Sequence, residues 1–233
     1  MFDKGQVLLL WALECQTEMK PEWNEWYNRE HVPGLLQVPG FISANRYENE
    51  AEKALPPLPP MPAMPQYMTF YELYDEHVLD SEEYHINRWS KGAGMRPEWT
   101  KRMMTVLTRI VGGIYRPFTD TWLSGSDRSA SKLWALFLQP IAGKEDIADA
   151  WYRERLLPAF QDSGFIKACR LFGPLERSPD VVGMVRKSDQ PQRIILTALN
   201  DDNVSVDSLQ DTWAAVRDAI SNAIGVFYRR MSL

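Results

Sequence analysis

Residues 26–33 read Trp-Tyr-Asn-Arg-Glu-His-Val-Pro and residues 39–46 read Pro-Gly-Phe-Ile-Ser-Ala-Asn-Arg, and a diverged copy of this unit occurs later in the chain. The copy reads Trp-Tyr-Arg-Glu-Arg-Leu-Leu-Pro over 151–158 and Gly-Phe-Ile-Lys-Ala-Cys-Arg over 164–170. Leu-Trp-Ala-Leu at 10–13 likewise returns at 133–136. Several motifs that recur in the same order indicate an internal duplication.

The central residue of the repeated unit differs between its two copies. His31 of the first copy is replaced by Leu156 in the second, whereas the preceding Trp-Tyr pair and the following proline are retained. An imidazole can accept and donate a proton near neutral pH, which a leucine cannot do. We therefore expect the first half of the chain to carry a chemical site and the second half to be structural.

Hydrophobic spacing predicts the same elements in the same order in both halves. In the first half we expect strands over 6–15, 41–48, 67–74 and 109–118, a helix from Pro21 through Leu35, and a second helix that begins with a capping box at Asp80 and Glu83 and resumes over 98–107. In the second half we expect strands over 132–139, 165–172, 193–199 and 225–231, with helices at 145–161 and 207–222. Each half therefore has the β-α-β-β-α-β order of a ferredoxin-like unit.

A ferredoxin-like unit covers one face of its sheet with helices and leaves the other face bare. Two units in one chain can bury their bare faces against each other. The predicted fold class is therefore α+β, with two ferredoxin-like units that form an intramolecular dimeric α/β-barrel arrangement. The predicted domains are residues 1–123 and 132–233, joined by a polar linker at 124–131.

Prolines mark irregular backbone in three places. Pro33 and Pro158 each remove an N–H from a helical pattern, which predicts a kink or a break near His31 and near its counterpart. Residues 55–65 contain six prolines and predict an extended surface segment. This segment is either a stiff connection or a flap over a pocket of the first half.

Composition limits the class of partner. The net charge is −5 and no block of Lys and Arg occurs, which argues against nucleic acid and anionic membranes as partners. The sequence has no apolar run of about 18 residues and no signal-peptide pattern, so we expect a cytoplasmic protein with no membrane span. Cys15 and Cys169 lie in apolar strand patterns and are expected to be reduced core residues.

The pattern Trp26-Tyr27-x-x-x-His31-x-Pro33, followed by Pro39-Gly40, resembles the EthD-like branch of the dimeric α/β-barrel superfamily. The likeness extends over residues 6–118, while the second half matches in element order and lacks the histidine. The resemblance implies a cavity between the sheet and its helices. Carried onto this chain, it implies a lining of Tyr27, His31, Arg46, Tyr71, His85 and Trp89, and Trp23 shares the helix face of Tyr27 and His31.

We expect a cofactor-independent lyase or isomerase that acts on a small apolar or aromatic carbonyl compound. In this hypothesis His31 moves the proton, Tyr27 or Tyr71 hydrogen-bonds the oxyanion, and Arg46 balances a carboxylate or an enolate. Two alternatives stay open: a cofactor-independent monooxygenase of a phenolic substrate, and a non-catalytic protein that binds a small ligand or acts in a stress response.

Cofactor motifs are not evident in the sequence. The three histidines and two cysteines have no metal-ligand spacing, and no glycine-rich phosphate loop follows a strand. We therefore expect no cofactor and no metal, although a haem held by a single histidine stays open. The expected assembly is a monomer with an internal pseudo-dimer, or a homodimer.

Overall fold

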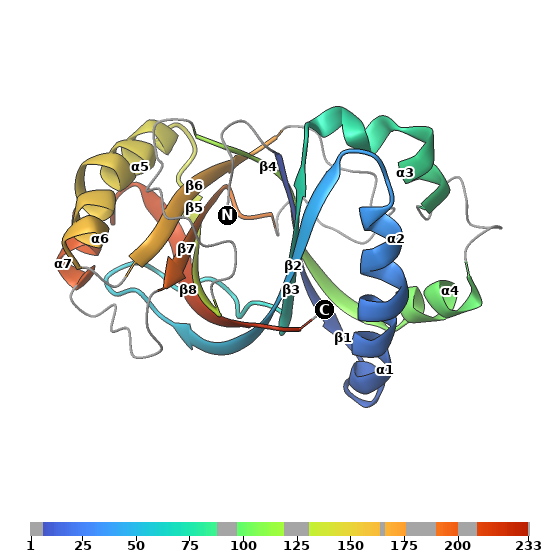
Figure 1. Ribbon diagram of the computed structural model, residues 1–233. Coiled ribbons are helices and arrows are strands. Elements are labelled where there is room, and N and C mark those ends of the chain that lie inside the picture. The colour runs from blue at the N-terminus through green and yellow to red at the C-terminus, as the bar shows by residue number, and fades with distance from the viewer. Residues whose placement is uncertain are drawn as a thin grey trace.

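The computed structural model describes residues 7–87, 97–118, 131–163, 166–175, 190–199 and 209–232. Their strands close into one antiparallel barrel in the order β1-β3-β2-β8-β5-β7-β6-β4, with helices on two opposite sides (Figure 1). The first half contributes β1 (Val7–Cys15), η1 (Thr17–Met19), α1 (Lys20–Trp26), the π-helical turn η2 (Tyr27–His31), α2 (Val32–Leu36), β2 (Phe41–Lys53), β3 (Tyr67–Leu73), η3 (Glu76–Asp80), α3 (Glu82–Asn87), α4 (Glu98–Thr105) and β4 (Leu107–Pro117). The second half contributes β5 (Lys132–Pro140), α5 (Glu145–Trp151), the π-helical turn η4 (Tyr152–Leu156), α6 (Leu157–Ser163), β6 (Ile166–Pro174), β7 (Arg193–Leu199), α7 (Gln210–Ala214) and β8 (Ile220–Arg230).

The two halves arrange their strands in the same way. The barrel reads β4-β1-β3-β2 across the first half and β8-β5-β7-β6 across the second, which is one order used twice. Two seams join the halves: β2 pairs with β8 from Tyr47 to Lys53, and β4 pairs with β6 from Tyr115 to Pro117. The α+β class and the closed barrel are as expected, whereas the division into two domains stays a prediction, and residues 124–130 of the expected linker lie outside the described residues.

Each strand buries both of its faces. Along β1, Leu8, Leu10 and Ala12 enter a core that residues of both halves share inside the barrel. The alternate residues Leu9 and Leu13 face outward and pack in a cluster with α1 and α4. The near-continuous apolar run of β1 therefore reflects burial on two sides, as the sequence predicted.

The prolines widen the helices without breaking them. The helix from Lys20 to Leu36 continues through the π-helical turn η2, which ends directly before Val32 and Pro33. The second half repeats this arrangement, with η4 directly ahead of Leu157 and Pro158. A proline cannot donate to the carbonyl four residues earlier, and a wider turn accommodates the missing hydrogen bond. The expected kink is therefore a π-helical turn in both copies.

Two helix predictions were wrong in detail. The helix expected over 207–222 is short, because α7 ends at Ala214 and β8 already begins at Ile220, where hydrogen bonds to β5 extend the ladder as far as Pro140. The capping residue of α3 is Ser81, whose Oγ accepts from the Tyr84 N–H at 3.2 Å. Asp80 instead ends the preceding turn η3.

The proline-rich segment 55–65 crosses to the second half of the chain. Leu55 and Leu58 are buried in the outer cluster of that half, and the Met61 N–H donates to the Ala223 carbonyl of β8 at 3.0 Å. Met64 enters the core inside the barrel, with Met61 packed against it. The segment is therefore a packed strap, and the hypothesis of a flap over the first half is wrong. None of the described helices has the length and apolarity to cross a membrane.

Candidate functional site

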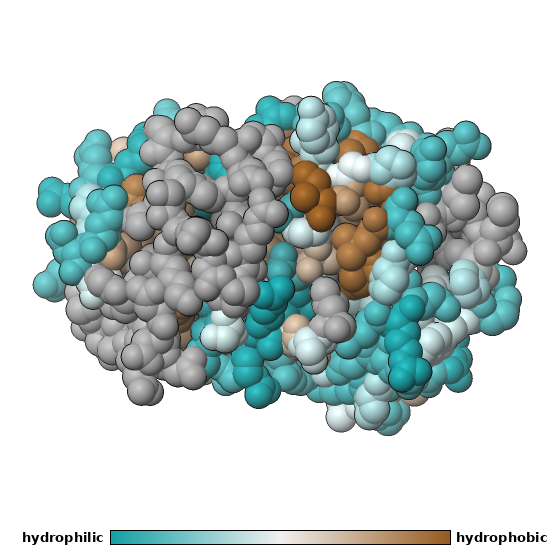
Figure 2. Space-filling view, in the orientation of Figure 1, coloured by the Kyte–Doolittle hydropathy of each residue, from teal (hydrophilic) through white to brown (hydrophobic). Residues whose placement is uncertain are grey.

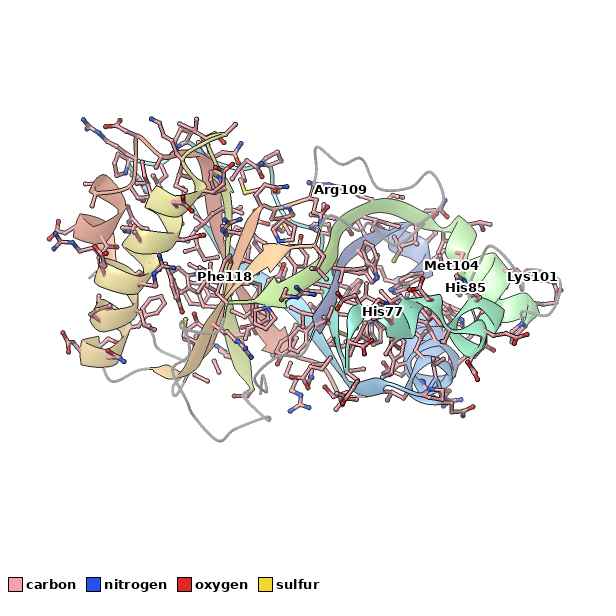
Figure 3. All side chains as sticks on the ribbon, turned by 90° about the horizontal axis from the view of Figure 1, so that it is seen from above. His77, His85, Lys101, Met104, Arg109 and Phe118 are labelled. Carbon is pink, nitrogen blue, oxygen red and sulfur yellow. The ribbon has the colours of Figure 1, made fainter. Side chains whose placement is uncertain are left out.

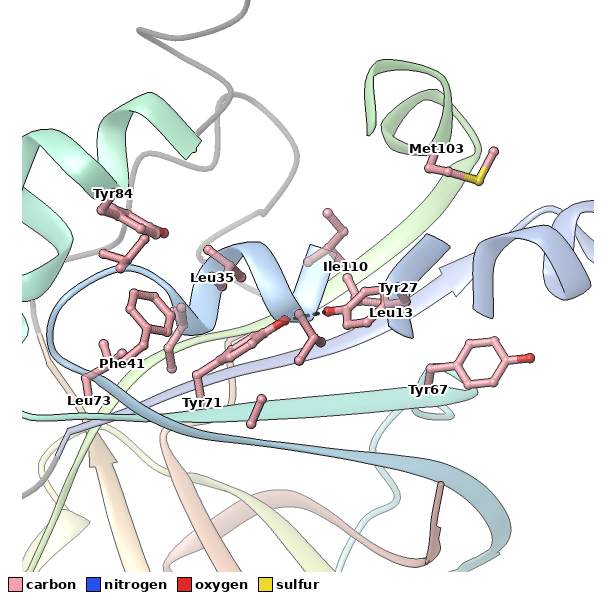
Figure 4. Packing of buried hydrophobic residues seen from close by; sticks show 14 of the residues in the cluster. Leu13, Tyr27, Leu35, Phe41, Tyr67, Tyr71, Leu73, Tyr84, Met103 and Ile110 are labelled. Carbon is pink, nitrogen blue, oxygen red and sulfur yellow. Dashed lines mark hydrogen bonds between the residues drawn. The ribbon is translucent and has the colours of Figure 1, made fainter. Parts of the chain in front are cut away.

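A buried aromatic cluster fills the space between α1 and the outer face of β1, β3 and β2. Tyr27 and Tyr71 lie at its centre with 1% and 0% exposure, and the Tyr71 hydroxyl donates to the Tyr27 hydroxyl at 3.2 Å (Figure 4). The ring of Phe41 stands edge-on to Tyr71 with centroids 5.7 Å apart. The predicted tyrosines are therefore brought together, and they are packed against each other.

Arg46 lies beneath the helix with only 1% exposure. Its guanidinium donates to the amide oxygen of Asn24 at 2.8 Å and to that of Asn28, and it stacks 4.2 Å from the centre of the Tyr27 ring. The contacts of Arg46 among the described residues therefore include two amide oxygens and an aromatic face. Such a face attracts a cation through its quadrupole.

Burial governs the titration of this cluster. It raises the pKa of Tyr27, an effect that the neighbouring Arg46 guanidinium partly opposes. Burial also holds the pKa of Tyr71 well above its ordinary range, and the contact with Tyr27 adds to this shift. Both phenols are therefore neutral at physiological pH and act as hydrogen-bonding groups rather than as bases.

His31 occupies the border between this cluster and the surface. It ends the π-helical turn, and its ring centroid lies 4.7 Å from that of Trp26 and 4.7 Å from that of Tyr27. The side chain is partly exposed, whereas the aromatic rings beneath it are buried. The imidazole is thus held by two rings and keeps a side that a small molecule can approach.

The other predicted site residues lie at different depths. Trp23 is buried beside Tyr27, with centroids 5.4 Å apart, and its indole N–H has no hydrogen-bond partner among the described residues. His85 lies on α3, toward the outer end of the first half (Figure 3), and reaches the cluster only through Tyr84, 6.2 Å from its ring. Trp89 lies outside the described residues.

The predicted lining residues Trp23, Tyr27 and Tyr71 are buried against one another. A surface cavity of about 410 Å³ lies instead between α1 and α4, and its lining residues are Glu22, Glu98, Trp99 and Arg102. None of the predicted site residues belongs to it. Among the predicted site residues, His31 is partly exposed, whereas Trp23, Tyr27, Arg46 and Tyr71 are buried.

The corresponding place in the second half is less polar. The Tyr152 hydroxyl lies 3.3 Å from the Cys169 thiol, and Leu156 at the position of His31 is fully buried. Cys169 pairs with Thr197 as Arg46 pairs with Thr69, so the structural counterpart of Arg46 is Cys169. The repeated sequences align Arg46 with Arg170, and this alignment is wrong by one residue. In a strand, a shift of one residue moves a side chain to the opposite face.

Sequence reasoning overlooked Asn24 and Asn28. These residues follow Trp23 and Tyr27 directly and are four apart, so one helix edge presents both amides to Arg46. This spacing of four residues was the sequence signal that could have identified them as one polar helix edge. Strict alternation would place Ile42 on one strand face with Ala44 and Arg46. A register shift between Phe41 and Ser43 instead leaves Ile42 40% exposed.

No protein-family model matches this chain, and no curated protein matches its sequence. Solved structures do match in fold. An anthrone oxidase-like protein superposes with a TM-score of 0.59 at 10% identity, covering 99% of this chain and 92% of its own. Candidate monooxygenases from Fusobacterium nucleatum subsp. nucleatum and Lactobacillus acidophilus give TM-scores of 0.58 and 0.55 at 7% and 6% identity, covering 99% and 98% of this chain and 94% of each relative.

These comparisons correct the expected reaction. The names of the similar structures indicate oxidase and monooxygenase chemistry, and they do not support the lyase or isomerase that we expected from the sequence. Sequence identities of 6–10% support a shared fold and do not establish a shared function. The chain therefore has the dimeric α/β-barrel fold of these structures, with all of its strands supplied by one polypeptide.

Proposed function

We propose that the first half of this chain binds a hydroxylated aromatic molecule against His31 and catalyses its oxidation by dioxygen without a cofactor. The observation that carries the proposal is the partly exposed imidazole packed against the rings of Trp26 and Tyr27, in a half whose counterpart has a buried leucine at the same position. Oxidase and monooxygenase names among the similar structures support the same class of reaction.

An apolar surface over α2, the helix that directly follows His31, suits an aromatic ring. Leu36 at the end of α2 and Ile42 at the start of β2 are each 40% exposed. Figure 2 shows apolar side chains gathered over α2 and the beginning of β2. A planar substrate that covers these side chains would gain from the removal of apolar surface from water. Its acidic proton would then face the imidazole.

The first step is a proton transfer. The His31 imidazole takes the proton of a phenol, or of a C–H next to a ring carbonyl, and leaves a delocalised anion. This anion gives one electron to dioxygen, and the resulting carbon radical and superoxide combine into a C–O bond. The product of this step is a peroxide anion, which takes the proton back from His31 and becomes a hydroperoxide. Loss of water from the hydroperoxide then leaves a C=O group: a ring CH₂ and O₂ give C=O and H₂O, and a phenol with a ring C–H and O₂ give a quinone and H₂O.

The buried residues hold the imidazole in place. Tyr27 contacts His31 directly and is itself fixed by Tyr71 and by the Arg46 guanidinium. The guanidinium keeps its positive charge behind the ring of Tyr27, where it favours an anion at the mouth of the site. These residues position the base and stabilise developing charge, and His31 moves the proton.

The test is oxygen uptake with anthrone and a panel of naphthols as substrates, after treatment of the protein with a metal chelator. Removal of a general base costs about 10²- to 10⁴-fold in rate, so His31→Ala should lose activity by that factor. Leu156→Ala changes the equivalent position of the second half and should leave the rate unchanged. Product made under ¹⁸O₂ should carry the label.

Three outcomes contradict the proposal. One is a folded His31→Ala protein with the wild-type rate. Another is substrate consumption without oxygen uptake, and the third is binding without turnover, which would leave the non-catalytic alternative.

We further propose that the two halves descend from one duplicated ferredoxin-like unit. The repeated strand order and the paired π-helical turns ahead of Pro33 and Pro158 support this origin. In this proposal the second half lost its imidazole and kept its role as the other side of the barrel.

A further inference from the structure

The residues that follow β8 leave the second half and reach the site of the first. The Met231 N–H donates to the Arg46 carbonyl of β2 at 2.9 Å, which continues the pairing of β2 with β8. The next carbonyl, of Ser232, accepts from the side-chain amide of Asn28 at 3.2 Å. Asn28 belongs to the π-helical turn η2, and β8 runs toward α1 and η2 before it ends (Figure 1). Residues 231–232 therefore join the second half to the strand and the helical turn of the first-half site.

The Met231 side chain lies on the same face of the sheet as Arg46. The register that pairs Tyr47 with Arg230 places Met231 opposite Arg46, and opposite residues share a face. This face is the outer one, because the Arg46 guanidinium bonds to Asn24 of α1. Met231 is accordingly partly buried against the outer aromatic cluster of the first half. A side chain of the second half thus adds to the packing around Arg46.

The amide of Asn28 uses both of its ends. Its oxygen accepts from the Arg46 guanidinium, and its nitrogen donates to the Ser232 carbonyl. An amide has an acceptor at one end and donors at the other, so these two bonds fix the direction in which the side chain points. The guanidinium packs 4.2 Å from the centre of the Tyr27 ring, and this ring lies 4.7 Å from the His31 imidazole. Asn28 therefore links the second half to the rings that hold the imidazole.

The first half makes a crossing of the same kind in return. Phe118 directly follows β4, and its N–H donates to the Leu171 carbonyl of β6 at 3.1 Å. Its ring packs against the outer cluster of the second half, 5.2 Å from the Arg193 guanidinium. Each half therefore receives a side chain from the end of the other. In the first half, this end also bonds to the turn that carries the imidazole.

We propose that Met231 and Ser232 form a positioning element of the His31 site, so that the second half completes the site of the first. The inference rests on the proposed function, because it assigns these residues a part in the same reaction. Their backbone holds Asn28 and the strand of Arg46, and Arg46 holds the Tyr27 ring against the imidazole. Asn28 also stands in the same helical turn as His31, so its bond to Ser232 restrains that turn directly. Both routes act through the imidazole, and neither moves a proton.

The first test removes a backbone donor. Met231→Pro lacks the N–H that bonds to Arg46, and the preceding Arg230 is already in a strand, which suits a residue before proline. One readout is the NMR signals of the His31 ring protons, assigned by their absence in His31→Ala. These signals depend on the neighbouring rings and should shift. The other readout is anthrone oxidation, in which kcat should fall about three- to tenfold, the value of one hydrogen bond, while KM changes less. Ser232→Ala keeps the carbonyl and should change neither readout.

A pair of matched substitutions isolates the amide bond. Asn28→Asp and Asn24→Asp each place a carboxylate beside the Arg46 guanidinium. The Asn24 amide nitrogen donates to the Tyr67 hydroxyl, which can rotate and donate to an aspartate instead. The partner of the Asn28 nitrogen is a carbonyl, which can only accept. Asn28→Asp should therefore shift the His31 signals and lower kcat more than Asn24→Asp does.

Failure of this inference is distinguishable from failure of the proposed function. Near-UV circular dichroism checks that each variant is folded, and the asparagine pair decides alone if Met231→Pro does not fold. Unchanged His31 signals in the folded variants overturn the inference, whatever their rates. Equal effects of Asn28→Asp and Asn24→Asp, or an unchanged kcat in a folded Met231→Pro enzyme, also overturn it. If the signals shift as expected while the wild type consumes no oxygen, the positioning of His31 by the second half is supported and the proposed oxidation is wrong.

Discussion

Gly112 shows how closely the strands approach each other in this barrel. Its φ is +142°, and a Cβ at this position would lie 2.1 Å from the carbonyl oxygen of Leu10 on the neighbouring strand β1. The contact involves backbone atoms of two paired strands, so neither side can yield without loss of the ladder. Only a residue that lacks a side chain fits here.

Gly112→Ala should therefore destabilise the protein, by about 2 kcal/mol or more, because strain and a backbone clash add. Gly34→Ala is the matched control, since a Cβ on this helical glycine meets nothing within 4 Å. The control should be stabilising by about 0.5–1 kcal/mol. Urea unfolding followed by tryptophan fluorescence measures both, and equal effects of the two substitutions would contradict the account.

Among the elements, the strap of residues 55–65 shows how the second half receives part of its core from the first. Leu58 is 4% exposed and lies in the outer cluster of the second half, together with Trp134 and Trp213. The adjacent backbone is held by the Ala223 N–H, which donates to the Pro59 carbonyl at 2.8 Å. The strap therefore contributes to the stability of the half that it crosses to.

Leu58→Ala should cost about 2–5 kcal/mol, the usual range for a buried leucine that leaves a cavity. Leu36→Ala removes a leucine that is 40% exposed and should change the free energy of unfolding far less. Equilibrium unfolding in guanidinium chloride distinguishes them. A mobile surface flap would predict two equally small effects.

At the scale of the whole molecule, the barrel and the helices that cover it take several phenols out of water at once. Burial raises the pKa of Tyr47 from its ordinary 10.0 to about 12, and it raises the pKa of Tyr27, Tyr71, Tyr115 and Tyr228 as well. A phenol whose pKa is higher in the folded state stays protonated there while the unfolded chain releases its proton. The stability from these groups is complete below pH 10 and falls as the pH rises through the folded-state values.

Ionisation of these phenols should therefore leave the free energy of unfolding unchanged below pH 10.0. Between pH 10.0 and about 12 the free energy of unfolding should fall steeply, and the tyrosinate absorbance of the buried phenols should appear together with unfolding. Tyr47→Phe removes one of the titrating groups. It should reduce the slope in this window by about 1.4 kcal/mol per pH unit. An unchanged slope would show that the Tyr47 phenol is accessible in the folded protein.

Local patterns were sufficient for the elements that bury an apolar face in regular alternation. The run of β1 and the Trp-Tyr repeats at Trp26 and Trp151 predicted strand and helix correctly, because side-chain period and proline position act within a few residues. The sequence also identified Tyr27, Tyr71 and Arg46 as neighbours. The roles of these residues stay predictions, and the hydrogen bonds of Arg46 to Asn24 and Asn28 were not foreseen.

The sequence by itself determined the element order, the repeated unit and the single imidazole at His31. Only the tertiary structure decided which side chains share a face after a register shift, so that Cys169 stands where Arg46 does and Arg170 enters the barrel. It also decided that the strap at 55–65 crosses to the other half. The physical reason is the sequence separation over which each effect acts. Hydrophobic period and proline geometry act between residues close in sequence, whereas strand register and barrel closure depend on hydrogen bonds between residues far apart in the chain.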